Sequence, residues 1–167
     1  MAEAVREAVS VQGRGVRIRA AVLAAALVVG AAPDGWRWPV EHVVVTHEYQ
    51  APAHAYGPGH RGIDLRLDDE RMLRAPADGV IAFAGQVAGR GVVTIDHGDG
   101  LVTTLEPAVT VLGVGSPVAR GDVVAEPGLG GHAAPGDVHF GVRRDGEYVN
   151  PRMLLGGVPR AVLLPCC

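Results

Sequence analysis

The 167-residue sequence predicts one all-β domain of antiparallel strands. It holds 24 glycines and 12 prolines but few aromatic residues, which is typical of short strands joined by tight turns. After residue 33 no apolar pattern with helical period runs longer than about two turns. The length fits one domain, since roughly 100–200 residues are usual. With 48% apolar residues, the chain can also fill a sizeable core.

Residues 1–32 are typical of a secretory signal that precedes this domain. Residues 1–19 carry four arginines against two glutamates, and an uncharged apolar run follows at Ala20–Ala32. The run matches the core of a helical signal peptide in length and is shorter than the ~20 residues that span a bilayer. Small residues before Pro33 offer a cleavage site, so we expect a secreted protein; an uncleaved N-terminal anchor is the alternative. No cysteine directly follows the run, which argues against a lipoprotein site.

The domain itself, predicted over residues 33–158, consists of short strands separated by turns. Runs rich in valine favour strands, and Asp-Gly and Gly-Asp-Gly sequences mark the hairpin turns between them. The predicted strands are Val43–Val45, Val80–Ala84, Val92–His97, Leu101–Leu105, Val109–Val114, Val118–Ala125, Val138–Arg144 and Glu147–Val149.

The charge and the C-terminal residues exclude some roles. A net charge of -3 gives no indication of nucleic-acid binding. Cys166 and Cys167 are adjacent and would close only a cramped ring with each other, so they do not staple the core. We expect residues 159–167 to form a disordered tail, with an intermolecular disulfide as the alternative.

Two motifs carry the residues suited to metal chemistry. G-P-G-H-R-G-I-D-L-R-L, residues 57–67, places His60 and Asp64 four residues apart behind a turn. G-D-V-H-F-G-V, residues 136–142, adds His139; its apolar residues alternate into the core, which leaves Asp137 and His139 on the opposite face. Two imidazoles and one carboxylate suit a catalytic zinc with its fourth position open to water. The alternative is that His60 caps a turn and Asp64 binds backbone amides.

Five stretches occur in the order His60–Asp64, Ala75–Gly85, Ile95–Thr104, Val114–Val124 and Val138–Pro151. They resemble the lysostaphin-type, or LytM-type, zinc peptidases, and the resemblance covers about residues 36–155. The resemblance implies an antiparallel β-sheet sandwich folded over a groove, known as the duplicated hybrid motif. It also implies Zn²⁺ as cofactor and peptidoglycan as substrate, because the family cuts peptide cross-links of the bacterial cell wall.

Carried over residue by residue, the resemblance assigns the zinc ligands to His60, Asp64 and His139. The family uses two further histidines for proton chemistry, and this chain departs from the pattern at both. Where a Y-x-H-L sequence is expected, the chain has T-L-E-P, with Glu106 or Pro107 near the histidine position. Where H-x-H is expected it has D-V-H, so that Asp137 replaces the first histidine.

Three residues are candidates to replace the missing histidines. Asp137 or Glu106 can serve as a general base, since a carboxylate accepts protons. His132 lies in a glycine-rich loop seven residues before His139 and can supply an imidazole by moving in. The alternatives are that Asp137 only begins a strand and that His132 is an exposed loop residue.

Other polar residues are assigned minor roles. His42 and His47 flank the first predicted strand and are expected to be structural, as is His97 in its hairpin. Tyr56 and Gly57 are candidates to line the groove. Arg143 and Arg144 are expected to be solvated, with contact to a carboxylate of the wall peptide as the alternative.

Two functions follow from these observations. The first is a secreted zinc metalloendopeptidase that acts on peptide cross-links of peptidoglycan. The second is a catalytically degenerate module of the same fold that binds the wall or activates another wall hydrolase, and it is favoured by the two substituted histidines. In both, the protein contacts a membrane only through its N-terminal segment.

Overall fold

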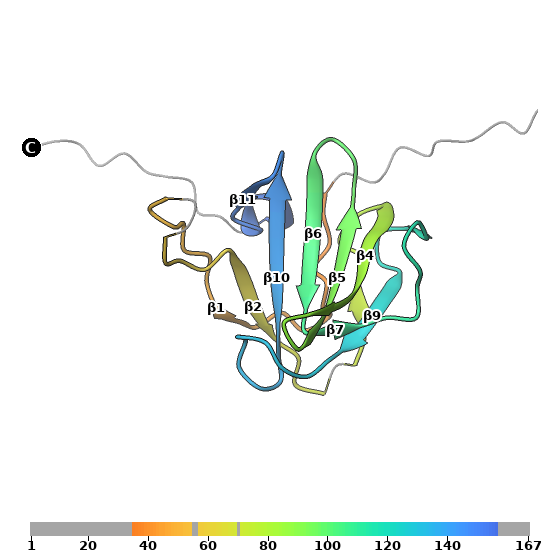
Figure 1. Cartoon of the computed structure of the whole chain (residues 1–167), viewed down its shortest axis with the longest axis horizontal. Helices are drawn as coiled ribbons and strands as arrows, with labels where there is room; N and C mark the ends of the chain where they lie inside the picture. The colour runs from red at the N-terminus through yellow and green to blue at the C-terminus, as the bar shows by residue number, and fades with distance from the viewer. Residues whose placement is uncertain (1–34, 55–56, 70, 157–167) are drawn as a thin grey trace, which may run out of the picture. The chain divides into compact units, whose positions relative to one another are not determined.

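The computed structural model describes residues 35–54, 57–69 and 71–156 (Figure 1). The predicted signal segment 1–32, Tyr56, and the tail 159–167 with Cys166 and Cys167 lie outside the described residues. Within the described ranges the fold is almost entirely antiparallel β, as predicted, and the one helix, α1 (Arg152–Leu155), has four residues. No helix in these ranges is long and apolar enough to cross a bilayer.

In the described ranges, the larger of the two sheets has eight strands. Its order is β1–β2–β10–β6–β5–β4–β8, with β11 paired to the end of β10. All of its pairs are antiparallel. The strands are β1 (Val45–His47), β2 (Gly62–Arg66), β4 (Gly79–Val87), β5 (Arg90–Asp96), β6 (Leu101–Glu106), β8 (Pro117–Val118), β10 (Asp137–Arg144) and β11 (Glu147–Val149).

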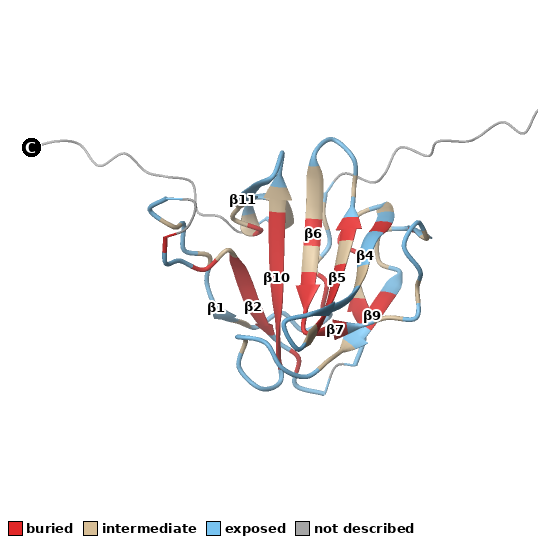
Figure 2. Cartoon of the chain, viewed as in Figure 1, coloured by how far each residue is buried: buried red, intermediate tan, exposed pale blue. Residues whose placement is uncertain are grey.

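A second, smaller sheet shares one core with the first. It has the order β3–β9–β7, from β3 (Leu73–Arg74), β9 (Val123–Pro127) and β7 (Ala108–Val109). Buried residues of both sheets form one apolar cluster, and they are prominent along β2, β5 and β10 in Figure 2. Burying a Val, Leu, Ile or Phe side chain stabilises the fold by about 1.5–3 kcal/mol. The fully buried large residues include Ile63, Leu65, Leu73, Ile81, Ile95, Leu105, Val124 and Phe140.

Strand β10 has the two-faced character predicted for it. Val138, Phe140 and Val142 are fully buried in the apolar cluster. Side chains alternate along a strand, so Asp137, His139 and Gly141 lie on the other face. The core pattern thus fixes which face of β10 carries polar chemistry.

Three strand predictions need correction. The strand predicted at Val109–Val114 ends at Val109, which pairs with β9; beyond it Val111 and Val114 are 100% and 67% exposed and belong to no strand. The strand predicted at Val118–Ala125 is divided by a turn in which Gly121 has φ +90°. The strand predicted at Val43–Val45 instead begins at Val45 and ends at His47.

Candidate metal centre

One row of four polar residues crosses strands β1, β2, β10 and β6. His47 is opposite Asp64, Asp64 is opposite His139, and His139 is opposite Glu106. Residues directly opposed in antiparallel strands share a face, with Cβ atoms roughly 4.5–5.5 Å apart. The strand register therefore sets two imidazoles and two carboxylates in alternation, although the four residues are distant in sequence.

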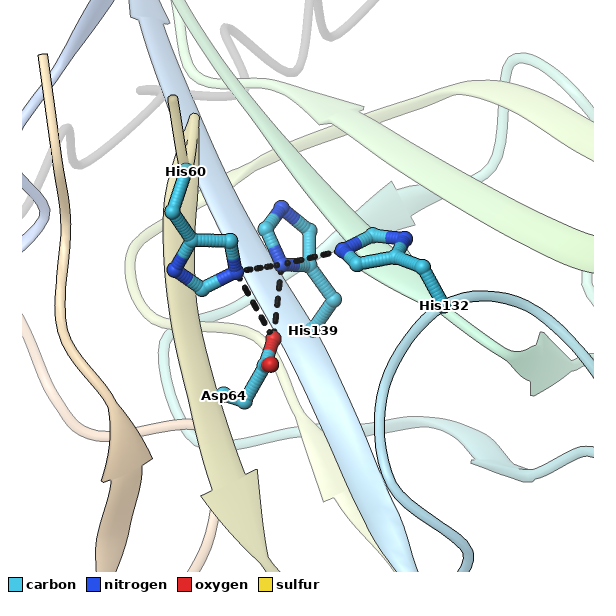
Figure 3. A group of neighbouring side chains, drawn as sticks. All are labelled: His60, Asp64, His132 and His139. Atoms are coloured by element: carbon cyan, nitrogen blue, oxygen red, sulfur yellow. Dashed lines mark hydrogen bonds and ion pairs between the residues drawn. The ribbon is translucent and has the colours of Figure 1, made fainter. Parts of the chain in front are cut away.

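Two loops bring further histidines to this row. His60 precedes β2 and is held by a pair of backbone hydrogen bonds with Gln50, each 2.9 Å. His132 lies in the loop before β10, where Gly130, Gly131 and Gly136 have positive φ. Side-chain donor atoms of His60, Asp64, His132 and His139 all lie within 4.8 Å of one another (Figure 3). We call these four residues the metal group.

The donor atoms of the metal group converge on one point. Oδ1 of Asp64 lies 3.1 Å from Nε2 of His60 and 2.8 Å from Nδ1 of His139. Those two nitrogens are 3.0 Å apart, and Nε2 of His132 is 3.3 Å from Nδ1 of His139. Ligands at the usual zinc distance of about 2.0–2.1 Å, set at tetrahedral angles, lie roughly 3.3 Å apart. The spacing and the nitrogen and oxygen donors fit a zinc ion.

Hydrogen bonding sets the tautomer of His60. Its Nδ1 lies 2.9 Å from the carbonyl oxygen of Glu48, which can only accept a hydrogen bond. Nδ1 therefore carries a proton, which leaves Nε2 as the ring nitrogen available to a metal. A backbone carbonyl commonly orients metal-binding histidines in this way.

The metal group is buried apart from His132, and its charge balance keeps Asp64 ionised. His60, Asp64 and His139 are 5%, 4% and 6% exposed. Burial by itself would raise the pKa of Asp64, but the hydrogen bond from His139 and the electrostatic influence of the surrounding histidines outweigh it, so the pKa lies below its usual value. An ionised carboxylate is the form that binds a metal.

Glu106, which Arg90 fixes, lies next to His132 on the side away from the metal group. Nε of Arg90 donates a 2.9 Å hydrogen bond to Oε2 of Glu106, while Oε1 lies 3.6 Å from Nδ1 of His132. Burial and the neighbouring His139 lower the pKa of His132, against the opposing effect of Asp64 and Glu106. His132 is therefore neutral near pH 7, with one nitrogen facing the metal group and the other facing a carboxylate.

Asp137, the third candidate base, is not part of this arrangement. Its Oδ2 accepts a 2.5 Å hydrogen bond from Oγ1 of Thr46, and its Oδ1 is 3.8 Å from Nε of Arg66. It is two residues from His139 along β10, roughly 7 Å by strand geometry. Asp137 shares the face of His139, as predicted from alternation, but its carboxylate is held by other partners.

His47 is close to the metal group, which its sequence context did not indicate. Its ring stacks on that of His60 with centroids 3.9 Å apart and an interplanar angle of 9°. Its Nδ1 is 3.5 Å from Oδ2 of Asp64. His97, in contrast, has the hairpin role expected for it, with Nε2 2.8 Å from Oγ1 of Thr103.

A groove of about 340 Å³ opens beside the metal group. Gly62 leaves the space that the ring of His139 occupies: a Cβ on Gly62 would lie 2.6 Å from that ring and 2.4 Å from the carbonyl oxygen of Phe140. Gly57 is not among the lining residues, but its carbonyl accepts a hydrogen bond from Arg61. The groove is lined by Gly59, His60, Arg61, Arg90, Thr104, Glu106, His132, His139, Gly141 and Tyr148.

Comparison with known proteins gives a family match and several relatives. Residues 58–151 match the family model described as Peptidase family M23. The uncharacterized protein Rv2891 of Mycobacterium tuberculosis is 34% identical over 143 residues, covering 78% of this chain and 57% of the relative. The DD-carboxypeptidase/endopeptidase Mpg of Neisseria meningitidis is 33% identical over 93 residues, covering 55% of this chain and 22% of Mpg. The murein hydrolase activator EnvC of Escherichia coli is 32% identical over 98 residues, covering 58% of this chain and 23% of EnvC.

This chain thus spans little more than half the length of Rv2891 and less than a quarter of Mpg or EnvC. Solved structures share its fold. The solution structure of lysostaphin aligns with a TM-score of 0.62 at 16% identity, covering 82% of this chain and 62% of that one. A second solved structure is a mutant of the catalytic domain of the prophage-encoded M23 protein EnpA of Enterococcus faecalis. It aligns with a TM-score of 0.57 at 25% identity, covering 71% of this chain and 98% of that one.

Proposed function

Because this chain belongs to peptidase family M23, we propose that it is a zinc metalloendopeptidase that cuts peptide cross-links of bacterial peptidoglycan. The observation that carries the proposal is the convergence of His60, Asp64 and His139. The names of Mpg and EnvC point to the cell wall and so support the substrate. The apolar run Ala20–Ala32 supports export, either as a secreted protein or with an N-terminal anchor.

Zinc would be held by Nε2 of His60, Oδ1 of Asp64 and Nδ1 of His139, the atoms that already face one another. A zinc ion in such a site acts as a Lewis acid toward a peptide carbonyl and lowers the pKa of a water molecule toward ~7. The ionised carboxylate of Asp64 offsets part of the charge of the cation. Burial of all three ligands keeps competing water away from them.

His132 supplies the proton transfer in this proposal. Its neutral imidazole accepts the proton of the attacking water through Nε2 and returns it to the amide nitrogen as the C–N bond breaks. Glu106 lies 3.6 Å from Nδ1 of His132, and Arg90 in turn fixes Glu106. A base oriented by a third group is a recurring arrangement in hydrolytic sites. In this proposal His132 takes over the role of the family histidines that Glu106 and Asp137 replace in sequence.

The proposal is tested with purified peptidoglycan and the zinc-loaded full chain. We expect new amino groups to be released, release to stop with a chelator, and release to return when zinc is added back. Asp64→Asn should abolish release, whereas the matched change Asp137→Asn should retain most of it. Absence of release from the zinc-loaded chain, or release that a chelator does not affect, would contradict the peptidase proposal.

A second function is favoured by the position of His132. Its Nε2 is close enough to His139 to be a fourth zinc ligand, and zinc sites closed by four protein ligands are usually structural. The protein would then bind the wall or activate another wall hydrolase without cutting peptides itself. His132→Ala separates the two functions. If His132 is the base, the variant keeps its zinc affinity and loses peptide release; if it is a ligand, zinc affinity falls and the wild type releases no peptide.

A further inference from the structure

The face of the larger sheet that carries the groove continues past the groove onto β5 and β4. Thr104 on β6 lines the groove and is opposite Gly141 on β10. On its other side Thr104 is opposite Thr94 on β5, and Thr94 is in turn opposite Phe83 on β4. Figure 1 shows these four strands side by side. Directly opposed residues share a face, so Phe83, Thr94 and Thr104 lie on the face of the metal group. We call these three residues the outer row.

A bulge in β4 turns Phe83 toward this face. Ile81 is opposite Ile95 and Phe83 is opposite Thr94, so β4 advances two residues where β5 advances one. Ile81 is fully buried in the core, and simple alternation would place Phe83 on the same side. The bulge instead puts Phe83 on the groove side, where it is 40% exposed. Bulges near functional sites often redirect a side chain in this way.

Gly85 gives the ring of Phe83 a place to lie on the strand. A Cβ on Gly85 would be 3.1 Å from Cζ of Phe83, so the far end of the ring lies over this glycine. Gly85 is opposite Val92, which is buried, so nothing at this position of β4 rises beside the ring. The outer row thus presents a partly exposed aromatic ring next to two partly exposed hydroxyl groups.

We propose that the outer row is a subsite for an N-acetylated sugar of the peptidoglycan glycan strand. One side of a pyranose ring consists of C–H groups, which pack against the aromatic ring of Phe83. The hydroxyl and acetamido groups at the edge of the sugar hydrogen-bond with Thr94 and Thr104, whose hydroxyls both donate and accept. The outer row has no charged side chain, which suits a neutral sugar. The inference rests on the proposed function and specifies its substrate more closely.

The distance between the outer row and the metal group defines the substrate class. Phe83 is three strands from β10 and one row from His139, roughly 16 Å by strand and residue spacing. An extended peptide advances about 3.3–3.6 Å per residue, so about four or five residues separate the sugar from a peptide bond at the metal group. The substrate is therefore a peptide that is still attached to its glycan strand.

NMR of the zinc-loaded full chain with labelled phenylalanine rings, titrated with chitotetraose, tests the subsite. This probe is a neutral tetramer of N-acetylglucosamine. The sequence contains two phenylalanines, and the second, Phe140, is fully buried in the core and serves as an internal control. We expect saturable shifts of the Phe83 ring signals and none of the Phe140 signals. The probe has no peptide cross-link, so its binding does not depend on peptidase activity.

Calorimetry with matched variants assigns the binding to the outer row. Phe83→Ala should weaken binding about ten-fold, because an aromatic contact and its buried area are lost. Thr94→Val should weaken it roughly five-fold, as loss of one neutral hydrogen bond does. Phe83→Tyr keeps the ring and should bind like wild type, as should Val123→Ala, which changes an exposed valine of the smaller sheet. Equal zinc affinity of all variants checks that the metal group is intact.

Three results overturn the subsite. They are the absence of saturable Phe83 shifts with chitotetraose, equal affinities of Phe83→Ala and Phe83→Tyr, and shifts of Phe83 by the peptide acetyl-Ala-D-Gln-Lys-D-Ala amide but not by the sugar. The last result would assign the outer row to peptide instead. Sugar binding by a chain that releases no peptide from peptidoglycan supports the subsite and contradicts the peptidase.

Discussion

His47 acts on the metal group through two of its members, although its sequence context predicted only a structural role. It stacks on His60 and lies 3.5 Å from Oδ2 of Asp64, whereas Oδ1 of the same carboxylate faces His60 and His139. Residues that orient metal ligands in this way typically contribute about 10–100-fold to metal affinity. We expect His47→Ala to weaken zinc binding by about ten-fold, measured by competition with a chelating dye. His42→Ala, at an exposed site on the same segment, is the control, and equal affinities for both variants would refute the role.

Gly62 limits the space around His139. A Cβ there would meet the ring of His139 and the carbonyl of Phe140 at distances that real side chains do not adopt. Gly62→Ala should therefore cost about 1–3 kcal/mol of stability, as overpacking does, and should lower zinc affinity. Gly113→Ala is the control because a Cβ at that position would meet nothing within 4 Å. Chemical denaturation of the two variants measures the difference, and a Gly62→Ala variant as stable as wild type would contradict this expectation.

The hairpin formed by β5 and β6 contains His97, whose pKa differs between the folded and the unfolded chain. Burial lowers the pKa of His97 below its ordinary value, although the carbonyl of Asp78 and nearby carboxylates oppose the shift. The unfolded chain then binds the proton more readily, with a pKa near ~6.5. The contribution of His97 to stability is therefore fully present above that pH, and it is lost as the pH falls through the lowered pKa of the folded state.

This linkage predicts how stability depends on pH. Between pH 7.5 and pH 5, wild type should lose more unfolding free energy than His97→Gln, which has no proton to bind. Urea denaturation at the two pH values measures the difference, with exposed His42→Gln as the control. If wild type and His97→Gln lose stability in parallel, His97 does not contribute the predicted linkage.

The strand predictions were most accurate where the sequence also marks the turn that joins a strand to its partner. The hairpin of β10 and β11 was predicted closely because Asp145-Gly146 marks the turn and apolar residues alternate in β10. The Val109–Val114 run has high strand propensity, but propensity does not supply a neighbouring strand. Within that run only Val109 belongs to a strand, where it pairs with β9.

For the candidate site, too, local sequence patterns did not predict which strands would be neighbours. The two motifs and the family resemblance suggested His60, Asp64 and His139 as a set, the loop suggested His132, and the structure brings these four side chains together. The row from His47 to Glu106 depends on the register between β1, β2, β10 and β6, which no local pattern specifies. For the same reason the sequence did not reveal that Thr46 holds Asp137 or that Arg90 holds Glu106.

For the described domain as a whole, the two faces of the larger sheet have different roles. One face contributes Phe140 and its neighbours to the core shared with the smaller sheet. The opposite face carries the metal group and the groove. The metal group forms only when β2 and β10 are folded together. A ligand that binds this group therefore binds the folded chain and stabilises it. A ligand at 100 times its dissociation constant adds about 2.7 kcal/mol to the free energy of unfolding.

A zinc titration of the full chain, followed by calorimetry and by the shift in unfolding temperature, tests the metal centre most directly. We predict one zinc ion per chain, a higher unfolding temperature with zinc, loss of both in Asp64→Asn and His139→Ala, and retention of both in Asp137→Asn. Failure of the wild-type chain to bind zinc, or equal binding by the Asp64→Asn and Asp137→Asn variants, would contradict the proposed metal centre.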